Sequence, residues 1–159
     1  MGIRTDINKK QEYIRLKWSE KERRIIVEDK DEDRFSLSVE EAIEACKVYE
    51  RNKQTLFRKQ FRTLLDFLGK WAYERRKKLA NVFLTIRDAG LLFLVVTKSK
   101  IHDEVFEDEL TQLDLDIARN KDFSEIFLSV QALPICDKNG YESFCNSEWT
   151  LEYTGIDAQ

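Results

Sequence analysis

Residues 80–98 read ANVFLTIRDAGLLFLVVTK, and this stretch decides the predicted fold. Every second residue from Ala80 to Ile86 is aliphatic, which is the period-two pattern of a strand with two different faces. Residues 91–96 are all apolar, so we expect a strand that is buried on both faces at the centre of the sheet. Gly90 is available for the positive φ of a short connecting loop. The stretch therefore predicts a hairpin over 80–98.

Residues 12–37 predict a small β-meander before this hairpin. Residues 13–18 alternate strictly, with Ile14, Leu16 and Trp18 on one face, and residues 24–28 repeat the pattern more briefly. An acidic stretch follows and predicts a solvated turn. After this turn, the apolar side chains near residues 35–37 indicate a third short strand.

Two helices are predicted within residues 39–78. Ser38 and Glu41 have the spacing of a capping box, in which each side chain bonds a free backbone amide, so a helix should begin at Val39. Apolar residues then recur at helical spacing in two separate stripes. One continuous helix would be roughly 60 Å long, whereas a compact domain of this size has a radius of gyration of about 15 Å. We therefore expect a break near Asn52.

The C-terminal part predicts one further helix and several strands. Apolar residues spaced by four, three and four predict an amphipathic helix over 103–119. Strands are expected within 125–153, with Asn139 and Gly140 as the type I′ turn of a hairpin. The first and last strands, 13–18 and 149–153, could form sheet edges that accept a strand from another chain.

This order of elements has no βαβ rhythm, which favours an α+β fold. We predict a mainly antiparallel sheet of about five to seven strands packed against two or three helices. The chain has 159 residues, of which 42% are apolar and 36% are charged, so a single domain over 1–159 with one core is expected.

Composition also bears on location. The longest apolar run, residues 91–96, is far shorter than the roughly 20 residues that cross a bilayer, and residues 1–12 lack a signal-peptide pattern. The three cysteines do not have the density of a disulfide scaffold. We therefore expect a soluble cytoplasmic protein with no membrane partner, in which Cys46, Cys136 and Cys145 are thiols.

The charge is sorted along the chain. Residues 51–78 contain ten lysines and arginines against two acids, a local charge of +8 in a chain of formal net charge −3. The candidate binding residues in this basic segment are Arg58, Lys59, Arg62, Arg75, Arg76, Lys77 and Lys78. Aromatic residues lie between these cations. The segment could therefore contact phosphates and bases, or be the wet face of a helix whose aromatics belong to the core.

Residues 103–125 are the acidic counterpart, with nine acids against Arg119 and Lys121. These acids could stabilise a helix start, pair with the basic segment, or bind a divalent metal through Asp103 and Glu107. His102 is the single histidine, and no nucleophile elbow or phosphate loop is present in the sequence. We therefore predict no catalytic residues, no metal ligands and no cofactor.

Sorted charge without catalytic motifs favours a non-enzymatic interaction or regulatory module, such as an adaptor, whose partner is a protein. A nucleic-acid-binding accessory protein that uses the basic segment is the first alternative. A metal-dependent hydrolase or nuclease that uses the acidic helix is the second alternative. The sequence does not indicate an oligomeric state.

Overall fold

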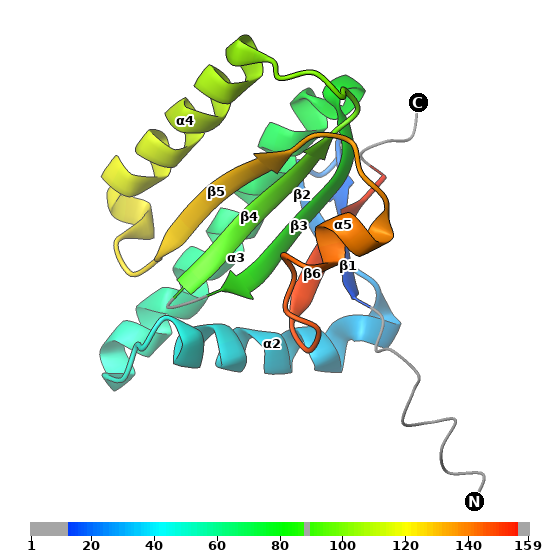
Figure 1. Cartoon of the computed structure of the whole chain (residues 1–159). Coiled ribbons are helices and arrows are strands. Elements are labelled where there is room, and N and C mark those ends of the chain that lie inside the picture. Colours follow the sequence, from blue (N-terminus) through cyan, green and yellow to red (C-terminus); the bar gives the residue numbers. More distant parts are fainter. Residues whose placement is uncertain (1–12, 88–89, 156–159) are drawn as a thin grey trace, which may run out of the picture.

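The computed structural model describes residues 13–87 and 90–155, which form a six-stranded sheet and four α-helices (Figure 1). The strands are β1 (Ile14–Ser19), β2 (Arg24–Val27), β3 (Leu79–Arg87), β4 (Gly90–Thr97), β5 (Leu128–Leu133) and β6 (Thr150–Thr154). The helices are α2 (Glu32–Ala45), α3 (Arg51–Glu74), α4 (Glu104–Arg119) and α5 (Lys138–Glu142). Three short 3₁₀ helices, η1 (Asp29–Asp31), η2 (Arg76–Lys78) and η3 (Lys121–Phe123), connect them.

The strands have the order β2-β1-β6-β3-β4-β5. Strand β6 is parallel to β1 and antiparallel to β3, so the end of the chain joins the two hairpins β1–β2 and β3–β4 into one sheet. Strand β5 is parallel to β4, because α4 carries the chain back to the end where β4 began. The predicted α+β class is confirmed, but the sheet is mixed. The expectation that no βαβ unit exists was wrong for β4-α4-β5.

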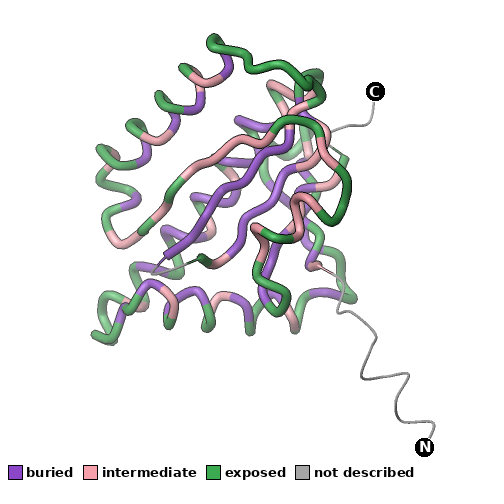
Figure 2. Tube along the Cα trace, in the orientation of Figure 1, coloured by how far each residue is buried: buried purple, intermediate pink, exposed green. Residues whose placement is uncertain are grey.

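Apolar side chains fill both faces of the central strands. On one face, side chains of α2, α3 and α4 pack against the strands in the main core, which includes Phe61, Leu84 and Phe93. On the other face, Phe83 and Leu94 belong to a smaller cluster, covered by side chains of α5 and the segments that flank it. Strand β4 is accordingly almost entirely buried and β3 is buried over its central residues, while β5 at the sheet edge is more exposed (Figure 2).

Helix α3 approaches the sheet unusually closely at Gly69. A Cβ added there would lie 2.7 Å from Ile25 Cγ2 and 3.2 Å from the rings of Trp18 and Tyr153. The Tyr153 hydroxyl donates to the Leu65 carbonyl of α3 at 2.8 Å. The absence of a side chain at this glycine therefore allows α3 to lie against β1, β2 and β6.

The N-terminal prediction was wrong after β2, because α2 begins at Glu32 rather than at Val39. The residues expected to form a third strand lie inside this helix. Ser38 does not cap it, since the buried Ser38 hydroxyl donates to the Phe35 carbonyl one turn earlier at 2.6 Å. The acids taken for a solvated turn include Glu32 and Asp33 in the first turn of α2, where the helix dipole favours negative charge. The break near Asn52 is confirmed, because α2 ends at Ala45 and α3 begins at Arg51.

The hairpin over 80–98 is confirmed by the antiparallel pairing of β3 with β4, but the roles expected of Gly140 and Gly90 were wrong. Residues 138–142 form α5 instead of a hairpin, and the Asp137 carboxylate caps this helix by accepting from the Gly140 amide at 2.9 Å. Asp88 and Ala89, which precede Gly90 within the predicted 80–98 hairpin, lie outside the described residues. Gly90 begins β4 without a positive φ, and a Cβ there would lie 2.9 Å from the Phe127 carbonyl oxygen. At residues 138–142, a capped helix therefore replaces the predicted turn.

The terminal strands lie inside the sheet, so the expectation that they form its edges was wrong. Strand β1 lies between β2 and β6, and β6 lies between β1 and β3. The edges are β2 and β5 instead. Cys46, Cys136 and Cys145 are free thiols, as predicted.

Candidate functional site: a lysine hollow

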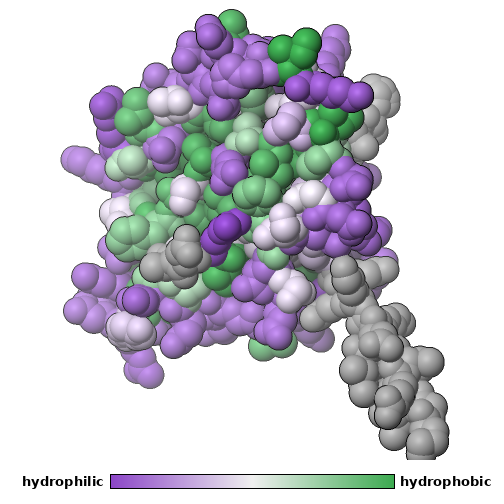
Figure 3. Space-filling model, in the orientation of Figure 1, coloured by the Kyte–Doolittle hydropathy of each residue, from purple (hydrophilic) through white to green (hydrophobic). Residues whose placement is uncertain are grey.

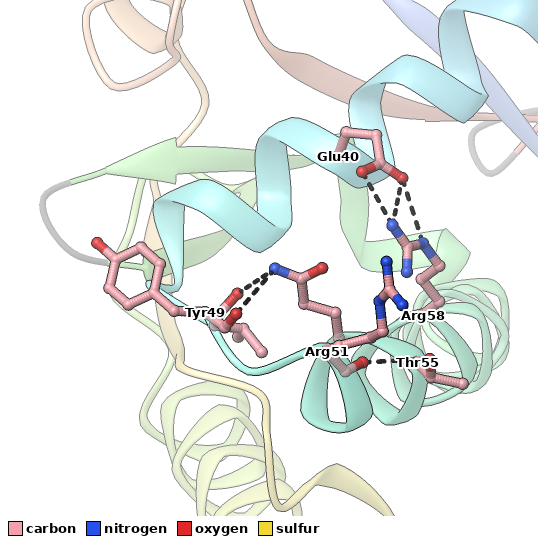
Figure 4. Close-up of polar contacts among 7 residues, drawn as sticks. Glu40, Tyr49, Arg51, Thr55 and Arg58 are labelled. Carbon is pink, nitrogen blue, oxygen red and sulfur yellow. Dashed lines mark hydrogen bonds and ion pairs between the residues drawn. The ribbon is translucent and has the colours of Figure 1, made fainter.

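The arginines of the basic segment mostly make contacts within the protein. Arg58 forms a bidentate ion pair with Glu40 of α2, with a shortest distance of 2.7 Å, and thereby links α2 to α3 (Figure 4). Nearby, the Gln54 side-chain amide donates to the Val48 carbonyl at 2.9 Å, which ties the start of α3 to the loop before it. Arg58 therefore has a local structural partner.

Arg62 contacts the edge strand β2. Its guanidinium donates to the Ile25 carbonyl at 3.2 Å and lies 5.6 Å from the centre of the Phe35 ring. One turn later, the Asp66 carboxylate accepts from the Ile25 amide at 2.9 Å. Two side chains of α3 thus satisfy both backbone groups of Ile25, which is a structural role for Arg62.

The next two arginines cover aromatic rings at the end of α3. The guanidinium of Arg75 lies 4.3 Å from the centre of the Trp71 ring, and its Nε lies 3.5 Å from Glu109 of α4. Arg76 lies 4.1 Å from the centre of the Tyr73 ring. The expected pairing of basic and acidic helices is therefore present between Arg75 and Glu109.

The three lysines of the predicted site differ from these arginines. Among the residues that the structure describes, no carboxylate lies within 4.0 Å of the ammonium groups of Lys59, Lys77 or Lys78. Lys59 lies on the exposed surface of α3, outside the hollow described below. Lys77 and Lys78 lie in η2, next to the end of β4, where the Lys98 amide donates to the Lys78 carbonyl at 2.9 Å.

This contact brings two pairs of lysines together around a depression of about 540 Å³. Its basic residues are Lys77, Lys78, Lys98 and Lys100, together with His102. Its apolar residues are Ile101, Phe106, Ala132, Leu133 and Pro134. We call this depression the lysine hollow. Within the described ranges, Lys98 and Lys100 also have no carboxylate within 4.0 Å of their ammonium groups.

The lysine hollow lies at the carboxyl ends of the parallel strands β4 and β5, where α4 begins. Ligands of open α/β sheets commonly bind at this position. Asp103 and Glu107 of α4 also line the hollow, so four lysines are opposed by two carboxylates. The Asp103 carboxylate already accepts from the Phe106 amide at 3.1 Å as the cap of α4. The two carboxylates come from the α4 side, whereas the lysines come from η2 and from the loop after β4.

Hydrogen bonds hold the loop that carries Lys98 and Lys100. The Thr97 hydroxyl lies 3.3 Å from the Leu133 carbonyl of β5, and the Ile135 amide donates to the Ser99 carbonyl at 3.1 Å. The Ser99 hydroxyl accepts from the Ile101 amide at 3.0 Å. The loop therefore has a defined conformation that connects β4 to the segment after β5.

Exposed apolar side chains occur at Ile101, which lines the hollow, and at two residues adjacent in sequence to lining residues, Val105 and Ile135. Ile101 is 78% exposed and Val105 is 66% exposed, and Ile135 is also exposed. In Figure 3, strongly hydrophobic atoms lie among hydrophilic ones at the top of the molecule, where Figure 1 places the start of α4. The hollow thus combines positive charge with apolar surface.

Sequence reasoning found only part of this site. Lys77 and Lys78 were predicted, but Lys98, Lys100 and Ile101 were missed. The available signal was the run KSKIH at residues 98–102, directly after a fully apolar strand. Its proximity to the basic segment depends on the antiparallel pairing of β3 with β4, which was predicted, so the two pairs of lysines could have been connected.

The other sequence candidates do not assemble into a chemical site. Among the described residues, no three His, Cys, Asp or Glu side chains are placed to hold a metal ion. Burial raises the pKa of the Cys46 thiol and raises the pKa of Cys145 to about 11. Burial likewise raises the pKa of the Tyr13 hydroxyl, which hydrogen-bonds Cys145. These groups are protonated at neutral pH and are poor nucleophiles.

Comparison with protein-family models, curated proteins and solved structures finds no significant match for this chain. Within the described part of the chain, no helix has both the length and the apolar character needed to cross a membrane. The function of this protein is therefore inferred from the geometry and charge of the lysine hollow.

Proposed function

We propose that this protein is an interaction module that binds an acidic partner protein at the lysine hollow. The observation that carries the proposal is the set of four lysines, without carboxylates within 4.0 Å among the described residues, around a depression with apolar walls. Unpaired cations attract a complementary surface, which increases the rate of association and selects the partner. The exposed Ile101 in the lining of the hollow favours a protein over a purely ionic ligand.

The same structure gives less support to nucleic-acid binding by the basic segment. Single-stranded nucleic acids are bound by cations together with exposed aromatic rings on which bases stack. Phe57, Phe61 and Trp71 are buried in the core, so these rings are not available for stacking. Arg58, Arg62 and Arg75 contact other residues of this chain. The chain is also acidic overall, with a pI of about 5.4.

A displayed library of random dodecapeptides tests the proposal even though the partner is unidentified. The purified protein selects binders, and the double variant Lys78→Glu/Lys98→Glu serves for counter-selection. We expect the selected peptides to be rich in Asp and Glu. Synthetic copies should bind the double variant at least tenfold more weakly, a loss of about 1.4 kcal/mol.

The matched control is Lys59→Glu/Lys121→Glu, which changes the net charge equally at exposed lysines outside the hollow. Its affinity for the same peptides should stay within about twofold of the unmodified protein. Equal losses in both variants would indicate a general charge effect and refute a site in the hollow. Labelled DNA and RNA are measured in parallel at about 50 and about 200 mM salt, and tight, salt-dependent binding would favour a nucleic-acid partner instead.

A further inference from the structure

We infer that the partner inserts one large apolar side chain into the lysine hollow, between carboxylates that pair with the lysines. This inference rests on the proposed function and specifies the chemistry of the segment that binds. The hollow measures about 540 Å³, within the range of roughly 300–1,000 Å³ typical of ligand sites. Pairing of surface ammonium groups with carboxylates would not by itself require an apolar depression.

The apolar floor of the hollow is continuous with the main core. Phe106 is buried and lines the hollow, and its ring centre lies 5.9 Å from that of Trp71. Trp71 in turn contacts Phe93 of β4 at 5.9 Å between ring centres. An inserted side chain would therefore contact a floor that packed aromatic rings support from below, beside Leu133 and Pro134.

The rim provides both kinds of contact that such a segment needs. Ile101 would be covered by the partner, and the aliphatic stems of the lysines add further apolar surface. The ammonium groups remain available for carboxylates on either side of the inserted residue. Because hydrogen bonds already order the loop over residues 97–101, binding does not have to order it.

Asp103 and Glu107 define the orientation of the segment. They line the hollow from α4 and would repel carboxylates from that side. The acidic residues of the partner should therefore face η2 and the loop after β4, with the apolar side chain pointing towards Phe106. A uniformly acidic segment would gain less, because part of it would lie against α4.

The test compares two synthetic peptides derived from the selected sequences. One keeps its large apolar residue, and the other has serine at that position with all acids unchanged. We expect the serine peptide to bind at least tenfold more weakly in fluorescence polarisation. Ala132→Leu, which reduces the free volume of the hollow, should weaken only the apolar peptide, whereas Ala118→Leu on the exposed surface of α4 should change neither affinity.

Ile101→Ser is a second test variant. It should not disturb the packing of the core, because the Ile101 side chain is largely exposed. It should weaken the apolar peptide about threefold or more without lowering the thermal midpoint. Equal affinity of the apolar and serine peptides would overturn this inference but leave acidic docking in place. If no acidic peptide bound at all, the proposed function itself would fail. If sedimentation showed dimerisation that required the same lysines, the occupant of the hollow would be a second copy of the chain, and the inferred acidic segment of a partner would be refuted.

Discussion

Replacing Gly69 with alanine tests whether the close approach of α3 to the sheet determines stability. Gly69 lies inside a 24-residue helix, where alanine is normally better than glycine by about 0.8–1.0 kcal/mol. Helix propensity alone therefore predicts a more stable protein. The structure predicts the opposite, because a Cβ at this position would lie 2.7 Å from Ile25 Cγ2.

The cost can be estimated from the neighbours that would have to move. Ile25 is fully buried and β-branched, so its methyl group cannot rotate away freely. Tyr153 is held by its hydrogen bond to the Leu65 carbonyl, and Trp18 is buried. Overpacking of a filled core costs about 1–3 kcal/mol, and we expect the upper end of this range here. After the propensity gain, the net loss is about 2 kcal/mol, which corresponds to a fall in Tm of about 4–8 °C.

Thermal and urea denaturation followed by circular dichroism measure this loss. Lys70→Ala is the matched control. Lys70 is the exposed neighbour of Gly69, so removing its side chain should change the free energy of unfolding by less than about 0.5 kcal/mol. In an Ile25→Leu background, which moves the branch away from Cβ, Gly69→Ala should cost measurably less. A Gly69→Ala variant more stable than the unmodified protein would refute the close packing described here.

The further predictions concern three sites: Thr85, Cys145 and the two arginines Arg75 and Arg58. Thr85→Val should lower the free energy of unfolding by about 2–4 kcal/mol in urea denaturation, because the buried hydroxyl accepts from the Asn146 amide at 2.8 Å and donates within the same network. At pH 8, the folded protein should alkylate at Cys145 about 100-fold more slowly than an ordinary thiol, since burial raises this pKa to about 11 from 9.0. The folded state also holds that proton more tightly than the unfolded chain, so the free energy of unfolding should fall as the pH rises from 9.0 to about 11. Arg75→Ala should destabilise the protein by about 2 kcal/mol and Arg58→Ala by less than about 1 kcal/mol in the same assay, because Arg75 is less exposed and covers an aromatic ring.

Each of these predictions has a specific control. Thr85→Ser keeps the hydroxyl and should lose less stability than Thr85→Val; equal losses would mean that packing, not hydrogen bonding, dominates. Mass spectrometry of alkylated peptides compares Cys145 in folded and guanidinium-unfolded protein, and similar rates would contradict its burial. Equal effects of the two arginine substitutions would show that the Trp71 contact contributes little.

Strong local periodicity was sufficient to predict several elements. The alternation in 80–98 predicted the β3–β4 pair, and the four-three-four spacing near Phe106 predicted α4. These patterns are reliable because a side chain's face follows directly from its position along a strand or helix. Short-range turn and cap signals failed at Ser38 and Gly140. The buried Ser38 hydroxyl donates to the Phe35 carbonyl instead of capping a helix, and the Gly140 amide donates to the carboxylate that caps α5.

The candidate site was likewise predicted only in part from the sequence. The concentration of cations in residues 51–78 could be counted from the sequence, and two members of the lysine hollow were found there. The sequence could not show that Arg62 contacts an edge strand 37 residues earlier, or that Arg75 covers Trp71 and meets α4. Exposure of a charge depends on which distant groups the fold brings beside it.

By itself, the sequence determined the α+β class, the break between α2 and α3, and the uneven distribution of charge, because composition and periodicity act through neighbouring residues. The tertiary structure alone decided the insertion of β6 between β1 and β3, the parallel pairing of β5, and which cations remain without carboxylate partners among the described residues. Pairing between distant strands depends on how whole faces pack and on where crossover helices return the chain. The lysine hollow results from that packing, since it forms where η2, the ends of β4 and β5, and the start of α4 meet.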